Sequence, residues 1–362
     1  MSRAERPVLL VGAMPWDSAE ETFRNAGPIV GDLAIGLTDG EFGLRRFWIF
    51  YVCVNTWFEH PDLDVVRMPK GIPDMPEWVP TGYDDMPWVQ LKAGTDTLRP
   101  IATLGYPQES SASYALFCKM REEGVIPAGV RFQQSLPFPD DAARLFTNDP
   151  ATFDAMTAAY AEVLERDIKT LCDSIPHEDL VIQWDINWET IALEHGDHMP
   201  DVAPMQFAPT RPALDRYTDY VRRLSTVVPA AVPLGLHLCY GDLHHQHFRD
   251  PNNVATSVAM ANAAADVSAR PLNFVQMSVP RHRNDDAFFE PLADLRFGDG
   301  TVYAGLVHYT DGVEGSVDRL AAFKRHYDGP TGVSTECGLG RRPHDQDIAK
   351  LLQMHCDIAA GI

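Results

Sequence analysis

The sequence predicts an α/β protein with the (β/α)8 TIM-barrel fold, formed by a single domain of residues 1–362. Eight short apolar segments typical of buried strands recur along the chain, and helical patterns lie between most of them. Polar residues follow several of these strands, which is where barrel enzymes carry their active sites. A long segment rich in proline and tryptophan follows the second strand. A doubly wound open sheet is the alternative, but no G-x-G-x-x-G follows the first strand.

The predicted strands are short apolar runs bounded by turn residues. The first is a continuous apolar run that ends at the turn G-A-M-P, and the second is closed by D-G-E-F-G. In chain order the eight strands are Val8–Met14, Asp32–Thr38, Gly129–Gln133, Leu180–Asp185, Pro233–Cys239, Leu272–Ser278, Val302–Val307 and Gly332–Thr335.

The predicted helices begin and end at recognisable capping and turn residues. Ser18 and Glu21 form a capping box, so a helix is predicted from there to about Asn25. Pro150 stands where a first helical turn begins, and Gly124 ends an earlier helix. The remaining predicted helices are Ser111–Glu123, Pro150–Cys172, Arg211–Leu224, Asn252–Val267, Val313–His326 and Asp345–Ile358.

The segment of residues 48–107 shows no clean period. Its prolines are too dense for helices or central strands. We expect its interleaved tryptophans, among them Trp48, to be shielded from water. We therefore expect an ordered insertion that packs over the C-terminal mouth of the barrel. An accessory subdomain or a contact between copies of the chain remains an alternative.

The composition excludes some partners. A formal net charge of −21 argues against nucleic acid and against an anionic membrane surface. We expect no secretory signal, and the most apolar stretch, Phe47–Val54, is too short to span a bilayer. Six scattered cysteines without a C-x-x-C pair favour a reducing, cytoplasmic compartment. The partner that remains is a small-molecule substrate, and a homodimer is left open.

One strand end carries a candidate metal site. His237 and Cys239 lie two residues apart at the end of the fifth strand, so both side chains point to the same face. Cys337 follows the eighth strand in the same way. Imidazole and thiolate are ligands suited to zinc. The sequence therefore predicts zinc as the cofactor, although a buried thiol and a hydrogen-bonded histidine would be the plainer interpretation of H-x-C alone.

Other polar residues follow the remaining strands and are expected to meet them at one rim. Singly, each has a plainer explanation as a helix cap or as a partner of a backbone carbonyl. A fourth metal ligand could come from His308 or from the tract His244, His245 and His247. The strand-end residues are Asp39 and Glu41 after the second strand, Asp185 after the fourth, Gln276 and Ser278 after the sixth, His308 after the seventh, and Glu336 after the eighth.

Five short blocks give the chain a resemblance to a known family. They are G-A-M-P at Gly12–Pro15, D-G-E-F at Asp39–Phe42, I-Q-W-D at Ile182–Asp185, H-L-C-Y at His237–Tyr240 and E-C-G-L at Glu336–Leu339. In this order they resemble G-S-F-P, H-G-E-F, I-Q-x-D, H-x-C-Y and D-C-G-L of the catalytic C-terminal barrel of cobalamin-independent methionine synthase. That family lies within the superfamily that also holds uroporphyrinogen decarboxylase.

The resemblance implies roles for five residues. His237, Cys239 and Cys337 would bind zinc, which in the family holds the homocysteine thiol as a thiolate. Glu41 and Asp185 would hold the amino group of the substrate.

Two departures from the family pattern stand beside these roles. Ser278 is the expected occupant of the position where the family has a fourth, glutamate ligand, and serine is a poor zinc ligand. Ala13 replaces the serine of G-S-F-P, which puts recognition of an amino-acid carboxylate in doubt.

The leading hypothesis is a zinc-dependent enzyme that transfers an alkyl group, most simply methyl, to or from a thiolate. Its catalytic residues would be Glu41, Asp185 and His308, and its substrate-binding residues Asp39, Glu41, Arg45, Trp48 and Asp185. One alternative is a metal-free decarboxylase or lyase, in which Asp39, Arg45 and Arg46 handle substrate carboxylates. The other is a metal- or thiol-binding barrel without turnover.

Overall fold

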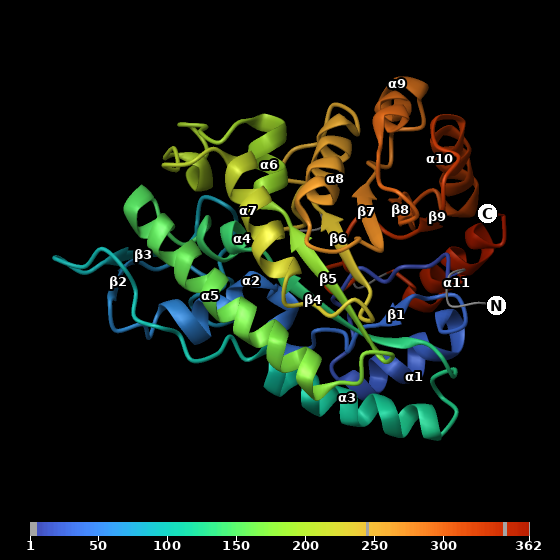
Figure 1. Cartoon of the computed structure of the whole chain (residues 1–362), viewed down its shortest axis with the longest axis horizontal. Coiled ribbons are helices and arrows are strands. Elements are labelled where there is room, and N and C mark those ends of the chain that lie inside the picture. Colours follow the sequence, from blue (N-terminus) through green and yellow to red (C-terminus); the bar gives the residue numbers. More distant parts are fainter. Residues whose placement is uncertain (1–5, 244–245, 343–345, 362) are drawn as a thin grey trace.

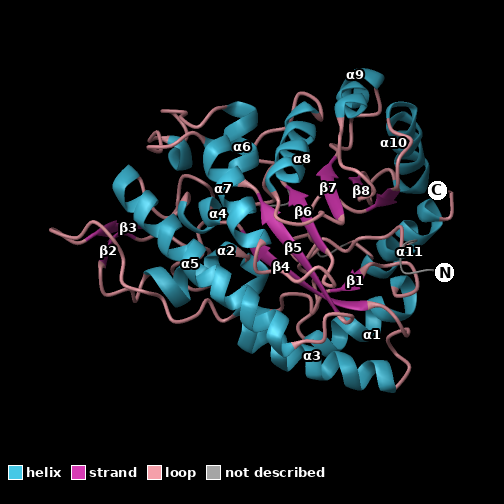
Figure 2. Cartoon of the chain, in the orientation of Figure 1, coloured by secondary structure: helices cyan, strands magenta, loops and turns pink. Residues whose placement is uncertain are grey.

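The computed structural model describes residues 6–243, 246–342 and 346–361. Its centre is a curled, seven-stranded parallel sheet flanked by helices, an architecture similar to a TIM barrel (Figures 1 and 2). The strand order is β1 (Gly36–Leu37), β4 (Arg131–Pro137), β5 (Leu180–Ile186), β6 (Leu234–Leu238), β7 (Phe274–Ser278), β8 (Thr301–Gly305) and β9 (Thr331–Val333).

The N-terminal segment lies between the two edges of this sheet. Val8 forms isolated parallel bridges to Ala34, just before β1, and to Val333 in β9. The Leu9 amide donates to the Val333 carbonyl at 3.0 Å. The predicted strand Val8–Met14 is therefore reduced to this bridge, because the residues after it turn away to the loops at the strand ends. There the Met14 amide donates to the carbonyl of Gly40 at 2.8 Å.

The helices follow the capping residues seen in the sequence. The Ser18 hydroxyl accepts from the Glu21 amide at 3.2 Å at the start of α1, and Asp149 caps α5 through the Thr152 amide at 2.8 Å. The longer helices are α1 (Ala19–Val30), α3 (Tyr106–Glu122), α5 (Pro150–Ser174), α7 (Ala213–Ser225), α8 (Ala255–Val267), α10 (Gly312–His326) and α11 (Ile348–Ala359). The short α4 (Pro139–Ala143), α6 (Trp188–His195) and α9 (Asp286–Phe289) were not predicted.

A small apolar cluster closes the inside of the sheet near the strand starts. It consists of Leu9, Val181, Phe274 and Tyr303, all buried. Glycines on neighbouring strands leave room for these rings: a Cβ added at Gly235 would lie 2.3 Å from the ring of Phe274. Large and small side chains thus alternate around the interior, as in packed barrels.

The interior becomes polar two residues further along β5 and β7, because side chains at i and i+2 share a face. Val181 is followed on this face by Gln183 and Asp185, and Phe274 is followed by Gln276 and Ser278. These side chains are buried and hydrogen-bonded, for example Gln183 to Asp185 at 2.8 Å. The polar end of the interior is the carboxyl end of the strands, where the site lies.

The segment of residues 48–107 contains more regular structure than its prolines suggested. A helix, α2 (Ile49–Val52), and a π-helical turn (Cys53–Trp57) precede Pro61, the first proline of the segment. The strands β2 (Leu63–Arg67) and β3 (Trp88–Leu91) then form an antiparallel pair that projects from the barrel in Figure 1. α3 begins at Tyr106, earlier than the predicted Ser111, because Pro107 occupies its first turn, where proline is tolerated.

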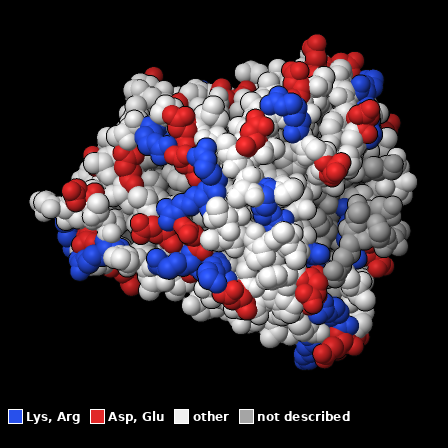
Figure 3. All heavy atoms as spheres, viewed as in Figure 1, with Lys and Arg blue, Asp and Glu red and all other residues white. Residues whose placement is uncertain are grey.

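The distribution of surface charge and the apolar character of the helices bear on possible partners. On the face drawn in Figure 3, acidic and basic side chains are interspersed, and no continuous basic surface is seen there. Among the residues described, no helix has the length and apolar character needed to cross a membrane.

Candidate metal centre

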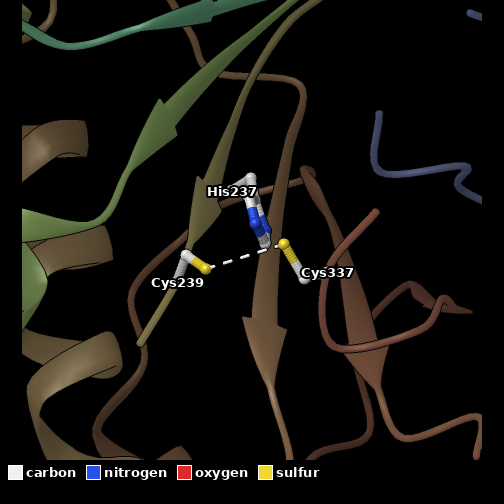
Figure 4. Close-up of side chains that lie close together, drawn as sticks. All are labelled: His237, Cys239 and Cys337. Atoms are coloured by element: carbon white, nitrogen blue, oxygen red, sulfur yellow. Dashed lines mark hydrogen bonds between the residues drawn. The ribbon is translucent and has the colours of Figure 1, made fainter. Parts of the chain in front are cut away.

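The structure brings together the three side chains that the sequence singled out as metal ligands. His237 is in β6, Cys239 follows it, and Cys337 follows β9. Their ligand atoms all lie within 4.8 Å of one another, and the two sulfur atoms are 3.8 Å apart. Figure 4 shows the imidazole of His237 pointing toward the sulfur of Cys337. Within the described ranges, this is the one group of three or more His, Cys, Asp or Glu side chains placed to hold a metal ion.

The donor set fits zinc. One imidazole and two sulfurs from different strand ends, with room for a fourth ligand, is the arrangement of a catalytic zinc site. His237 is 3% exposed, and its Nε2 atom is buried without a hydrogen-bond partner. A buried nitrogen beside two sulfurs with no protein partner is satisfied by a cation.

Hydrogen bonds share protons among these ligands. The Cys239 thiol donates to the Cys337 sulfur, which lowers the pKa of Cys337 well below and raises that of Cys239 well above the usual range. Burial lowers the pKa of His237, but the closeness of Cys337, the charge of Asp185 and the hydrogen bond to Gln276 outweigh this and raise it to about 9. The protein alone therefore favours an imidazolium beside a thiolate, and a metal bound here displaces the proton.

The three ligands lie on one wall of a pocket of about 460 Å³, counting its open mouth. Glu41, Asp185 and Trp48, three of the residues predicted to bind substrate, also line it. Other lining residues are Val11, Gly12, Ala13, Asn187, Gly241, Asp242, Gly338 and Arg341.

The surroundings of Glu41 and Asp185 raise the pKa of both carboxyl groups, which favours their neutral form. Burial, followed by repulsion from Asp185 and Asp39, raises the pKa of Glu41 to about 8. Burial raises the pKa of Asp185 to about 6, although His237 and the Gln183 amide oppose the shift. Glu41 also has a positive φ of 48°, which places its side chain beside Gly12. A cationic group entering the pocket would bring both carboxyls to their charged form.

We expect Glu41→Gln to change the pH dependence of stability. A pKa of about 8 in the folded chain, against the ordinary 4.5, means that the folded state holds a proton that the unfolded state loses as the pH rises between these values. Stability therefore falls across this window, by at most about 1.4 kcal/mol per pH unit. The glutamine variant lacks this slope, so its advantage over wild type should grow from pH 5 to pH 8. Urea unfolding of both proteins with a chelator present measures it, and an equal difference at both pH values would contradict it.

Asp39 and Arg45, also predicted to bind substrate, bind each other. The Arg45 guanidinium lies 2.8 Å from the Asp39 carboxylate, and both side chains are buried. Asp39 also accepts from the Ser113 hydroxyl at 2.7 Å and from the Glu41 amide at 2.9 Å. Neither residue lines the pocket, so in this structure the pair holds the loop that carries Glu41.

Trp48 lies between the metal-side pocket and a second, largely apolar pocket. The second pocket is also lined by Phe47, Phe50, Tyr83, Met86 and Leu145. Trp48 has a positive φ of 55°, unusual for a bulky residue, and its indole nitrogen is buried without a partner. Strain and an unsatisfied donor at a pocket wall are typical of a ligand-binding position.

His308 lies in a different cavity, on the far side of Glu336. Its Nε2 donates to the Val279 carbonyl at 2.9 Å, and its Nδ1 is 3.5 Å from the Glu336 carboxylate. Burial lowers the pKa of His308 to about 3, so the ring is neutral. His247 lines the same cavity, 3.3 Å from Glu336, whereas His244 and His245 lie outside the described residues.

The region next to the ligands contains two residues that the sequence did not single out, Arg341 and Asp242. Arg341 lies 3.7 Å from the Cys337 sulfur and forms an ion pair with Asp242 at 3.1 Å. Of the predicted strand-end residues, Ser278 has its hydroxyl within hydrogen-bond distance of the carbonyls of Leu238 and Glu336, and Gln276 contacts His237. Arg341 and Asp242 lie on loops, where no periodicity marks them. The only signal was their closeness in sequence to Cys337 and Cys239.

Comparison with known proteins finds similarity at the level of the fold. No family model matches the sequence, and no curated protein matches it. A B12-independent methionine synthase from Shewanella sp. W3-18-1, in complex with selenomethionine, is similar with a TM-score of 0.55 and 13% identity, over 98% of this chain and 97% of that one. A methyltransferase from Methanosarcina mazei gives 0.54 and 10%, over 99% and 94%. A putative vitamin-B12 independent methionine synthase from Listeria monocytogenes gives 0.52 and 13%, over 95% and 86%.

Proposed function

We propose that this chain is a zinc-dependent enzyme that activates a thiol and transfers an alkyl group, most simply methyl, to or from its sulfur. The observation that carries the proposal is the cluster of His237, Cys239 and Cys337 in the wall of a pocket that also contains Glu41 and Asp185. Zinc held by these three ligands would lower the pKa of a bound thiol and orient it. The thiolate sulfur is the nucleophile, and the donor's leaving group departs with the electron pair.

The remaining pocket residues would position the reacting molecules. Glu41 and Asp185 would bind a cationic or amino group of the small-molecule substrate, and its positive charge would offset their mutual repulsion. Trp48 and the apolar pocket behind it would receive an apolar part of the thiol or of the alkyl donor. Arg341, through Cys337 and Asp242, would hold the mouth of the pocket in place.

Two further observations support this proposal over the alternatives. The fold is similar to that of a B12-independent methionine synthase in complex with selenomethionine, of a putative methionine synthase and of a methyltransferase. The decarboxylase alternative needs Asp39 and Arg45 for substrate carboxylates, but here they neutralise each other in a buried pair.

The test has two parts. The first is the zinc content of wild-type protein purified without a chelating column, with about one zinc per chain expected. The second is incubation of the zinc-loaded protein with a panel of small thiols and methyl donors, followed by mass spectrometry of the S-methylated product. We expect product from the zinc-loaded protein and none after chelation. A metal-free wild type would contradict the proposal, and bound zinc without turnover on any thiol would favour the binding protein.

A further inference from the structure

Gln276, in the middle of β7, is a fully buried residue that touches both halves of the metal centre. It is 0% exposed, and the register of the sheet places it opposite His237 in β6. Its Nε2 donates to the carbonyl oxygens of Thr335, at 3.0 Å, and of Glu336, at 3.2 Å. These two residues directly precede Cys337. One amide thus joins the strand of one ligand to the segment of another.

The two carbonyls settle which way the amide faces. Carbonyl oxygens only accept, so the Gln276 nitrogen must lie on their side and its Oε1 must lie on the side of His237. Oε1 is within hydrogen-bond distance of His237 Nδ1. Because Oε1 also only accepts, Nδ1 must carry the proton. In the neutral imidazole the lone pair is then on Nε2, the buried atom that has no partner.

We propose that Gln276 is the positioning residue of the metal centre. It fixes His237 in the tautomer that ligates through Nε2, and it holds the backbone before Cys337 at a set distance from that ring. This inference rests on the proposed function, since it assumes that the three ligands bind zinc. Ser278 supports the same segment, because its hydroxyl donates to the Glu336 carbonyl at 2.9 Å.

An amide side chain can both accept the hydrogen bond from His237 Nδ1 and donate to the two carbonyl oxygens. A leucine of similar size would leave Nδ1 and both carbonyls without this partner. A glutamate would still accept a hydrogen bond from Nδ1, but its second carboxylate oxygen cannot donate and would repel the two carbonyl oxygens. Partners of this kind in known metal sites typically contribute 10–100-fold in metal affinity.

The test measures zinc affinity by competition with a chromogenic chelator in wild type, Gln276→Leu and Gln276→Glu. The matched control is Gln133→Leu, because Gln133 is another buried interior glutamine, whose Nε2 donates to the Leu10 carbonyl at 2.7 Å and which contacts no ligand. We expect about a 10–100-fold loss in Gln276→Leu, and an affinity within a few-fold of wild type in the control. In ¹⁵N-histidine NMR of the zinc-loaded proteins, His237 should be the Nδ1–H tautomer in wild type and in Gln276→Glu.

The outcomes separate this inference from the proposed function. A wild type without zinc removes the proposed function itself. A wild type that binds zinc, with Gln276→Leu binding it equally well, overturns the role of Gln276 alone. If Gln276→Leu shows no cooperative unfolding transition, Gln276→Glu decides. If Gln276→Glu bound zinc with wild-type affinity, Gln276 would not anchor the segment before Cys337. If His237 carried its proton on Nε2 in this variant, Gln276 would not set the tautomer.

Discussion

Arg216→Met is expected to destabilise the protein by about 3–5 kcal/mol, the range for a buried ion pair that loses one partner. The Arg216 guanidinium lies 2.6 Å from the Asp140 carboxylate and 3.1 Å from that of Asp197. The side chains of Arg216 and Asp140 are only 3% and 1% exposed. Methionine fills much of the same volume but carries no charge, so the carboxylate of Asp140 would be left in the core with the Tyr220 hydroxyl, at 3.0 Å, as its remaining side-chain partner.

The size of this effect comes from the carboxyls around Asp140. Asp141 and Glu189 are also fully buried, and burial raises the pKa of both well above the usual range. Asp141 accepts from the amides of Asn187 and Trp188, at the start of α6. The cluster therefore braces α4 and α6, which begin just after β4 and β5. Asp141 and Glu189 stay protonated here, so without Arg216 the charge of Asp140 would stand uncompensated among buried groups that cannot offset it.

Urea unfolding measures this prediction, with Arg223→Met as the control. Arg223 forms an ion pair with Glu165 at 2.6 Å, but both side chains are more than a third exposed. Such a surface pair contributes at most about 1 kcal/mol. Because the penalty arises from an uncompensated charge, adding Asp140→Asn to Arg216→Met should recover part of the loss. Equal losses in Arg216→Met and Arg223→Met would contradict the argument.

The sequence was most informative where one physical rule fixes a position. Alternation along β6 sets His237 and Cys239 on one face, and parallel strands bring their carboxyl ends to one edge, so the closeness of His237, Cys239 and Cys337 could be predicted without knowing the packing. Seven predicted strands overlap the observed ones for the same reason, since continuous apolar runs are typical of parallel strands buried on both faces.

Other features depended on contacts between distant parts of the chain. Local pattern could not show that Asp39 and Arg45 would pair with each other rather than face the substrate. It also could not show that Val8–Met14 would pair only at Val8, because the turn toward Gly40 is set by the loop across the rim. In the sequence, Gln276 is marked only as a polar residue near a strand end. Its role depends on two carbonyls some sixty residues later in the chain.

Cys337→Ala is expected to abolish stable zinc binding while leaving the fold intact. Bound zinc should fall from about one per chain to well under a tenth, since two ligands cannot hold the ion against water and a chelator. The fold should persist because Cys337 lies after β9 and is only partly buried. Metal analysis measures the first effect. Thermal unfolding measures the second effect, since an intact fold gives a cooperative transition. In the same experiment zinc at a hundred times its Kd should stabilise wild type by about 2.7 kcal/mol and the variant not at all.

Cys118→Ala is the matched control for this change, because Cys118 is a partly buried thiol in α3, away from the pocket. It should keep both the zinc and the thermal shift. Thiol methylation should be lost in Cys337→Ala together with the metal, since the sulfur nucleophile depends on the same ligands. Full zinc content in Cys337→Ala would place the ion elsewhere. The pocket with Glu41 and Asp185 would then have no zinc to activate a bound thiol, and the proposed function would have to be abandoned.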